Sequence, residues 1–368
     1  MSPMPSRRPT ARDVAAELGV SAKTVSNAYS RPDQLSAELR ERILATAARL
    51  GYPGPHPVAA GLRRGRVGAI GVAYANRLSY AFDDPVARAL LAGMTSVAES
   101  AGAGLLLLPG SSDLEQRIAA INGAVVDGLI IASLPDDDPL LRAAIARRLP
   151  IVVVDQPRPV RLARLAPGIP WVGVEDRPAA AEAAEHVLAL GHERLGVVSF
   201  GLWQRPARGL VDPAAQQAAT YAVSRDRLAG YRDALERRGL DWSRVPVFQG
   251  VDSTPEEGEA GAAVVLARTP RPTALLCLSD RLAEGALRVA GRLGLRVPDD
   301  LSLVGFDDAV PTAAVLGLTT VRQPHRGKGE HAARVLLALR DGADPGPPAA
   351  PLPTQLVIRR STGPVPSA

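Results

Sequence analysis

The sequence predicts an α/β protein with two parts: an N-terminal head of three helices in a helix-turn-helix arrangement, and a larger two-lobed body built on parallel sheets. Short apolar runs alternate with helical patterns throughout the chain after Arg66, which is typical of parallel sheets covered by helices on both faces. The first 66 residues instead contain three short amphipathic stretches. We expect a head over residues 1–52, a hinge over 53–66 and a body over 67–368.

Positive charge is concentrated at the N-terminal end. Residues 1–66 contain eleven Lys and Arg against five Asp and Glu, a net charge of +6, whereas the whole chain carries +5. A basic head on a nearly neutral body is expected of a protein that binds nucleic acid, because phosphate contacts need cations on one face. A solvated tail is the alternative, but the segment is patterned and capped, unlike disordered sequences.

Two short helices begin the head. The first follows Thr10, whose Thr-x-x-acid pattern can cap free N–H groups, and it ends near Leu18. Gly19 supplies a sharp turn, and Ser21 caps a second helix over residues 22–29. A three-residue link between two such helices is the helix-turn-helix arrangement.

A third helix is predicted from Ser36 to Gly51. Its apolar stripe would pack against the first two helices and give the head its own core. The stripe consists of Leu39, Ile43, Ala47 and Leu50.

The second helix of such a unit enters the major groove and reads base edges. Its outward positions include Ala22, Lys23, Ser26 and Asn27. Lysine can donate to guanine, asparagine can pair with adenine, and an alanine can touch a thymine methyl group. The alternative for Lys23 is a contact to phosphate only.

The body is predicted from its alternating elements. Strands are expected at the apolar runs VGAIGVAY, GLLLLP, VDGLIIAS, IVVVD, RLGVVSF, VPVFQG, TALLCLS and LSLVGFD. Helices are expected over residues 85–101, 179–190, 225–238, 256–268, 280–293 and 326–341.

Several function classes lack their motifs. No Walker loop, no Gly-x-Ser-x-Gly elbow and no metal-spaced Cys/His cluster occurs, and the glycines at 65, 68 and 71 have the wrong spacing for dinucleotide binding. We therefore expect no enzyme activity, no cofactor and no metal. A single Cys277, no export signal and no long apolar stretch predict a cytoplasmic protein that does not enter membranes.

The head resembles that of the LacI/GalR family of bacterial regulators. The stretch ARDVAAELGVSAKTVSNAYSRPDQLS, followed by RERILATAARLGY, carries this resemblance, above all V-S-x-x-T-V-S at residues 20–26. In that family a hinge helix forms on DNA and a leucine from it wedges into the minor groove. PVAAGL at residues 57–62 matches the hinge, although alanine replaces the usual arginine at Ala60 and Gly61 disfavours a helix. The predicted DNA contacts are Thr10, Ser21, Ala22, Lys23, Thr24, Ser26, Asn27, Tyr29, the wedge Leu62 and Arg63.

The body resembles the periplasmic-binding-protein-like effector domain of the same family. The motifs are LGHERLGVV (190–198), RLAGY (227–231), LSLVGFDD (301–308) and LTTVRQ (318–323). The resemblance implies that Arg227 and Asp307 grip an effector between two lobes; a structural ion pair or helix cap is the alternative. It places Asp155, Ser279, Asp280 and His325 in the cleft as well. Three aromatic residues in expected loops are candidates to stack on a sugar or base: Tyr80, Phe82 and Trp203.

These observations predict a sequence-specific transcriptional regulator, most often a repressor in this family. Its expected partners are a pseudo-palindromic double-stranded DNA operator, a second copy of the chain in a homodimer, and a small-molecule effector such as a sugar, nucleoside or purine. One alternative is a sugar-modifying enzyme that uses the aspartates, and the helix-turn-helix head argues against it. The other is a solute-binding transport component, which would need an export signal.

Overall fold

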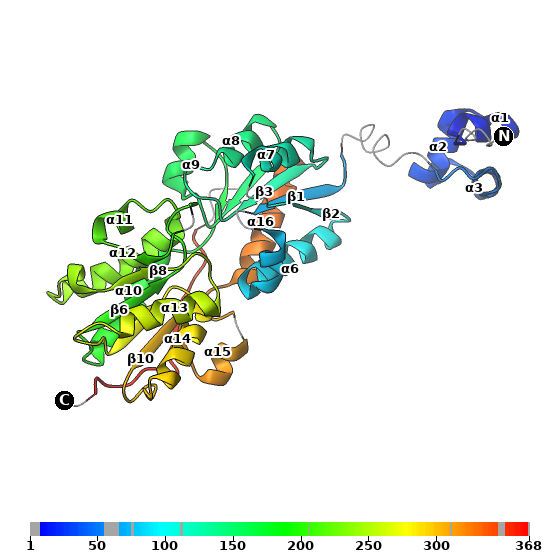
Figure 1. Ribbon diagram of the computed structural model, residues 1–368. Helices are drawn as coiled ribbons and strands as arrows, with labels where there is room; N and C mark the ends of the chain where they lie inside the picture. The colour runs from blue at the N-terminus through cyan, green and yellow to red at the C-terminus, as the bar shows by residue number, and fades with distance from the viewer. Residues whose placement is uncertain are drawn as a thin grey trace, which may run out of the picture. The chain divides into compact units, whose positions relative to one another are not determined.

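The structure is a computed structural model. It describes residues 8–54, 66–74, 77–110, 113–205, 207–309, 311–344 and 350–366. The chain divides into two compact units, Met1–Gly68 and Ala69–Ala368 (Figure 1); the predicted boundaries of head, hinge and body stay predictions, and the two units are called the head and the body below. None of the described helices has the length and apolar character needed to cross a membrane.

The head contains the three helices that the sequence predicts. They are α1 (Ala11–Leu18), α2 (Ala22–Ser30) and α3 (Ala37–Leu50), with a short 3-10 helix η1 (Pro32–Gln34) before α3. Gly19 ends α1 at a φ of 67°, a left-handed conformation that favours glycine. Ser21 Oγ accepts the N–H of Thr24 at 3.0 Å and so begins α2. Side chains from all three helices form a small core that includes Val14, Val25, Ile43 and Ala47.

The first lobe of the body contains a parallel sheet in the order β2-β1-β3-β4-β5. Its strands are β1 (Ala69–Tyr74), β2 (Gly104–Leu108), β3 (Gly128–Ala132), β4 (Ile151–Val154) and β5 (Trp171–Val172). Its helices are α5 (Leu78–Asp83), α6 (Pro85–Ser100), α7 (Leu114–Gly123), α8 (Pro139–Ala146) and α9 (Pro159–Leu165). A helix from late in the chain, α16 (His325–Arg340), also belongs to this lobe, where it lies beside α6 (Figure 1).

The second lobe contains a sheet in the order β12-β11-β10-β9-β6-β8-β7. Its strands are β6 (Leu195–Ser199), β7 (Gly209–Leu210), β8 (Val247–Gln249), β9 (Ala274–Cys277), β10 (Ser302–Asp307), β11 (Thr319–Arg322) and β12 (Gln355–Val357). The edge strands β7 and β12 run antiparallel to their neighbours, and the other strands are parallel. The helices are α10 (Asp176–Ala189), α11 (Pro213–Gln217), α12 (Ala222–Arg237), α13 (Pro255–Leu266), α14 (Asp280–Arg292) and α15 (Pro311–Leu316), with a 3-10 helix η2 (Trp242–Arg244).

The chain passes between the lobes three times. It leaves the first lobe after β5 to form α10, returns after β11 to form α16, and crosses again to form β12. Two of these crossings lie side by side, because Val174 forms a parallel bridge with Leu352, whose N–H donates to the carbonyl of Gly173 at 2.8 Å. The carboxyl ends of strands in both lobes therefore lie near the connecting segments.

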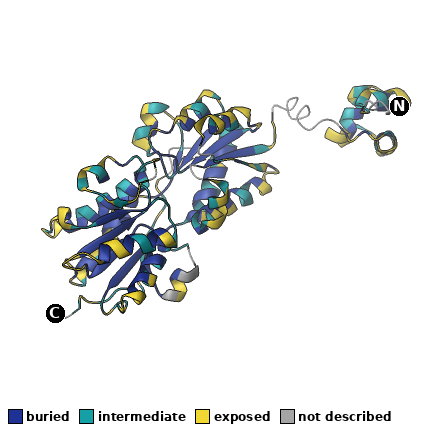
Figure 2. Ribbon diagram, in the orientation of Figure 1, coloured by how far each residue is buried: buried dark blue, intermediate teal, exposed yellow. Residues whose placement is uncertain are grey.

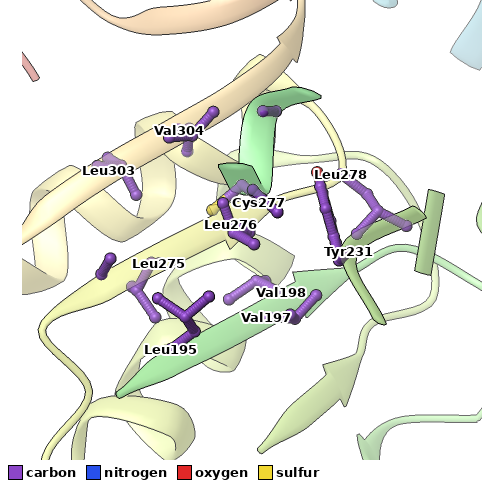
Figure 3. Close-up of a cluster of buried hydrophobic side chains, with 14 of the residues drawn as sticks. Leu195, Val197, Val198, Tyr231, Leu275, Leu276, Cys277, Leu278, Leu303 and Val304 are labelled. Carbon is purple, nitrogen blue, oxygen red and sulfur yellow. The ribbon is translucent and has the colours of Figure 1, made fainter. Parts of the chain in front are cut away.

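Burial follows the layered arrangement. The central strands are buried and the outer faces of the helices are exposed (Figure 2). Figure 3 shows part of the second-lobe core, where Leu195, Leu275 and Leu303 pack around the sheet. The unpaired Cys277 lies inside this core, and burial raises the pKa of its thiol far above the ordinary value.

Glycines allow pairs of helices in the body to approach closely. A Cβ added to Gly230 on α12 would lie 2.1 Å from the carbonyl oxygen of Arg177 on α10. Gly329 between α16 and α6, and Gly285 between α14 and α13, each face a backbone oxygen at 2.0 Å from the added Cβ. The close packing of these three helix pairs therefore requires glycine, which has no side chain, at these positions.

Gly230→Ala is expected to lower the free energy of unfolding of the body by about 1–3 kcal/mol, because the added methyl group overpacks the α10–α12 contact. Gly291→Ala is the matched control: no atom lies within 4 Å of the added Cβ, and alanine is favoured over glycine in a helix by about 0.5–1 kcal/mol. Denaturant unfolding of the full chain measures both. Equal midpoints for the two variants would refute the close-contact explanation.

Candidate functional site

Helix α2 presents three of the predicted base-reading residues, Lys23, Ser26 and Asn27, away from the head's core. Val25 and Ala28 are buried, so the helical periodicity directs the neighbouring positions outward. On this outer face Lys23 is exposed, and Ser26 and Asn27 are half-buried. Ala22 is half-buried and packs against the core of the head, so its contact with DNA stays a prediction. The placement of the other three suits contact with base edges.

Other predicted DNA contacts also have interactions within the head. The hydroxyls of Ser21 and Thr24 lie 2.8 Å apart at the start of α2, and the Thr10 hydroxyl donates to the carboxylate of Asp13 at 2.8 Å. The ring of Tyr29 contacts the ring of Tyr52 edge-on, with 6.1 Å between the two ring centroids. Thr10 caps α1 and Ser21 caps α2, and the contact of these residues with DNA stays a prediction.

The predicted hinge helix lies outside the described residues, because the description stops at residue 54 and resumes at residue 66. Leu62 and Arg63 belong to this segment. The wedge role of Leu62 and the phosphate contact of Arg63 therefore stay predictions.

A cleft of about 730 Å³ lies between the two lobes of the body. The ends of β1 and β10 contribute Tyr74 and Asp307, and Asp155 directly follows β4. Helices α12 and α16 add Arg227 and Lys328. Ligands of open α/β sheets bind at the carboxyl ends of strands, and this volume suits a small molecule.

Arg227 is held in place by several partners. Its Nε donates to Asp176 Oδ1 at 2.8 Å, and its Nη1 donates to the carbonyl of Leu278 at 2.5 Å. Its Nη2 lies 3.5 Å from Asp307 Oδ1. The guanidinium carbon also lies 3.7 Å from the centroid of the Phe306 ring. The position of this cation is thus fixed by the protein itself.

The strand-end carboxylates of the two lobes are connected by hydrogen bonds. Lys328 Nζ donates to Asp155 Oδ1 at 2.7 Å and to Gln323 Oε1 at 3.2 Å. Gln323 Nε2 donates to Asp307 Oδ1 at 2.7 Å. A ligand that contacts either carboxylate therefore contacts a network that spans both lobes.

Further contacts join the lobes at the sides of the cleft. Arg158, which begins α9, donates to Asp176 Oδ2 and to Asp226 Oδ2, both at 2.6 Å. The hydroxyl of Tyr80 on α5 donates to the carbonyl of Ser253 at 3.4 Å. The lobes are thus held by charged contacts on one side and a weak hydrogen bond on the other.

Burial and charge determine the protonation of the cleft. Burial raises the pKa of Asp307 well above its usual range, and Arg227 opposes this. Burial, with the positive charges of Lys328 and Arg227, holds the pKa of His325 well below the ordinary value, so the imidazole is neutral near pH 7. Burial alone would raise the pKa of Asp176, but Arg227 and Arg158 together lower it.

Three cleft residues have left-handed backbone conformations. The φ angles are 60° at Ser133, 61° at Asp155 and 109° at Asp307. Such conformations are rare for residues other than glycine and cluster at functional sites. All three follow or end parallel strands, which marks this edge of the sheets as the candidate site.

The structure brings together six of the nine predicted effector contacts. The residues that line the cleft are Tyr80, Asp155, Trp203, Arg227, Asp307 and His325. Phe82 does not line it and is 55% exposed. Tyr80 and Phe82 lie on helix α5 rather than in a loop as expected. Because they are two positions apart on a helix of 3.6 residues per turn, their side chains point to opposite sides of it.

Ser279 and Asp280 were expected in the cleft but are buried behind its lining. Ser279 Oγ accepts the N–H of Leu282 at 3.2 Å and caps α14. Asp280 accepts a hydrogen bond from the Thr320 hydroxyl at 2.5 Å. Both side chains therefore have structural partners at the start of α14, and their contact with an effector stays a prediction.

Because Asp280 is buried, we expect the free energy of unfolding to depend on pH. Burial raises the pKa of Asp280 to about 7, above the value of about 3.9 in an unfolded chain. The stability associated with the protonated folded form is fully present below about pH 4 and is lost as the pH rises to about 7, by roughly 4 kcal/mol.

Asp280→Asn should therefore flatten the change in melting temperature between pH 4.5 and pH 7.5, because asparagine stays uncharged. Thermal unfolding of both proteins at each pH measures the difference. An identical pH dependence in the variant would show that Asp280 does not titrate in this range.

The sequence reasoning missed Tyr74, Gln323 and Lys328. Lys328 had a signal: the chain has 43 Lys and Arg, and only Lys23 and Lys328 are lysines. Gln323 is the last residue of the motif LTTVRQ (318–323), and the sequence did not indicate a role for it. Tyr74 ends a predicted strand, and the position of a strand end in a cleft is visible only in the fold.

Two stretches of the chain match known families. Residues 10–54 match the bacterial regulatory proteins of the lacI family, and residues 184–362 match a periplasmic binding protein-like domain. An HTH-type transcriptional regulator of Mycobacterium tuberculosis is 44% identical over 372 residues, which cover 99% of each chain.

Solved structures extend the similarity to three dimensions. The Lac repressor dimer bound to operator and the anti-inducer ONPF has a TM-score of 0.74 at 27% identity, covering 97% of this chain and 100% of that one. The complex of the transcriptional regulator CelR with cellobiose has a TM-score of 0.68 at 26% identity, covering 96% and 100%.

Proposed function

The chain belongs to the LacI family of bacterial regulatory proteins, and we propose that it is a homodimeric repressor whose affinity for a pseudo-palindromic operator is controlled by a small-molecule effector bound between the lobes. It is a helix-turn-helix transcriptional regulator and not an enzyme. The proposed effector is a sugar, a nucleoside or a purine.

The observation that supports effector control is the hydrogen-bond network of Asp155, Lys328, Gln323 and Asp307, called the cleft floor below. Asp155 in the first lobe and Asp307 in the second are joined through Lys328 and Gln323. A ligand placed against these carboxylates would interact with both lobes at once, so its binding energy depends on their relative arrangement. A ligand that prefers one arrangement shifts the population toward it.

The proposed DNA contact rests on the exposed face of α2. Lys23 is exposed beside the half-buried Asn27, at positions where a reading helix meets bases. The proposed dimer follows from the solved Lac repressor complex, which is a dimer on its operator. A twofold dimer reads two half-sites of a pseudo-palindrome.

Selection of the sequences that the full chain binds from a pool of random duplex DNA tests this proposal. We expect enrichment of a pseudo-palindromic site bound by one dimer. Binding should weaken steeply with salt, because each neutralised phosphate adds about −0.9 to the slope of log K against log salt concentration. Random recovered sequences, or a slope near zero, would contradict a role in operator binding.

A further inference from the structure

The start of helix α12 and the segment before it touch the first lobe at several points, and from these contacts we infer a latch that must open before the two lobes can separate there. The latch consists of Asp136 and Gln156 of the first lobe and Thr220, Val223 and Arg225 of the second. The inference goes beyond the proposed function, because it concerns the motion of the lobes and not the ligand.

Asp136 contacts the second lobe with both its backbone and its side chain. Its N–H donates to the carbonyl of Thr220 at 2.9 Å, and its Oδ2 accepts from Arg225 Nη1 at 2.7 Å. Only 15% of the Asp136 side chain and 29% of the Arg225 side chain are exposed, so salt and water screen this ion pair less than a pair on the open surface. One first-lobe residue is therefore held twice by the other lobe.

The first turn of α12 supplies a second contact. Val223 is the second residue of this helix, where a backbone N–H has no partner within the helix. That N–H donates instead to Gln156 Oε1 of the first lobe at 2.9 Å, and Gln156 is 3% exposed. Separation of the lobes would remove this acceptor, so the hydrogen bonding of the helix start depends on the closed latch.

Each half of the latch is fixed by its own lobe. In the first lobe Asp138, two residues after Asp136, accepts from Arg117 Nη2 at 2.9 Å, and the two side chains are 0% and 5% exposed. In the second lobe the N–H of Thr220 donates to the carbonyl of Leu202 at 3.0 Å. Because neither half can follow the other, we expect the latch contacts to break together when the lobes part.

The contacts at the start of α12 are stronger than the contact at α5. Next to Arg225, the carboxylate of Asp226 accepts from Arg158 Nε at 2.6 Å. At α5 the hydroxyl of Tyr80 donates to the carbonyl of Ser253 at 3.4 Å, and both groups are neutral. Charge-assisted hydrogen bonds are about twice as strong as neutral ones. The latch therefore restrains the lobes more than the α5 contact does.

Hydrogen exchange of the full chain tests the latch. Asp136→Ala removes the carboxylate and keeps the backbone N–H. The reporter is the amide of Val223, which lies in the other lobe and is held by a different residue, Gln156. An amide exchanges in proportion to the fraction of time for which its hydrogen bond is open. We expect exchange at Val223 to become about tenfold faster, since the lost charge-assisted hydrogen bond contributes about that factor.

Asp137→Ala is the matched control. Asp137 is the next residue, and its partner Arg161 lies in the same lobe, so exchange at Val223 should stay as in wild type. Asp136→Asn, which keeps the size of the side chain and removes its charge, is a second variant with a smaller expected acceleration. Unchanged exchange at Val223 in both Asp136 variants would overturn the latch. An equal acceleration in Asp137→Ala, or at the amide of Leu129 in the first-lobe sheet, would also overturn it.

The operator affinity of the same variants separates this inference from the proposed function. If the arrangement of the lobes controls DNA binding, Asp136→Ala should change the affinity for the selected operator with no compound added. Faster exchange at Val223 with unchanged operator affinity would keep the latch and contradict control through the arrangement of the lobes. Unchanged exchange, with an operator affinity that responds to a compound bound in the cleft, would refute the latch and keep effector control.

Discussion

Replacing Arg227 by alanine is expected to lower the free energy of unfolding of the body by about 3–5 kcal/mol, the usual cost of removing one partner from a buried ion pair. Arg227 is the cation between Asp176 and Asp307, and it also donates to the carbonyl of Leu278. Its loss leaves the buried Asp307 without its nearest cation. Urea unfolding followed by circular dichroism measures the change.

Arg177→Ala is the matched control. Arg177 forms a bidentate pair with Asp233 on the surface, with 54% of its side chain exposed, and such pairs contribute about 0–1 kcal/mol. Folded Arg227→Ala should also bind operator yet lose its response to effector, since the head has a core of its own. A variant as stable as Arg177→Ala with a normal effector response would remove Arg227 from the site.

Replacing both Lys23 and Asn27 by alanine should abolish preference for the selected operator. Each good base contact contributes about 1–3 kcal/mol of discrimination, so the double variant should lose a factor of roughly 30 to 10⁴ in specific affinity. Non-specific binding should fall far less, because phosphate contacts elsewhere remain. Fluorescence anisotropy with operator and scrambled duplexes measures both affinities.

Asn122→Ala is the control for this experiment, because Asn122 is an exposed asparagine on α7 in the body. It should leave both affinities unchanged. Equal loss of operator and scrambled binding in the Lys23 and Asn27 variant would mean that α2 is not the reading helix.

The regular elements of the fold were largely predictable, and the exceptions have physical causes. Gly19 and Gly51 end α1 and α3, and Ser21 and Ser36 cap the starts of α2 and α3. Because these signals are local, the three helices of the head could be predicted from the sequence. The strand β11 was missed because Thr319 and Thr320 interrupt its apolar pattern, although both are fully buried. Helix α5 was expected as a loop because six residues are too few for a clear helical period.

The site was less predictable than the fold. The pairing of Arg227 with Asp307 was implied by family resemblance, since the two residues lie 80 positions apart in the chain. Ser279 and Asp280 do not line the cleft; from sequence alone a helix-capping pair and a ligand-binding pair have the same residue types. Lys328 was missed because lysine is normally a surface residue, and here Asp155 makes its burial possible.

Reciprocal linkage between operator and effector tests the central claim most directly. The affinity of the full chain for the selected operator is measured with and without a saturating compound that binds the cleft, and the affinity for that compound is measured with and without operator. Allosteric coupling predicts that both affinities change by the same factor, typically about 5- to 150-fold. Operator affinity that stays constant as the compound saturates the cleft would contradict effector control of this regulator.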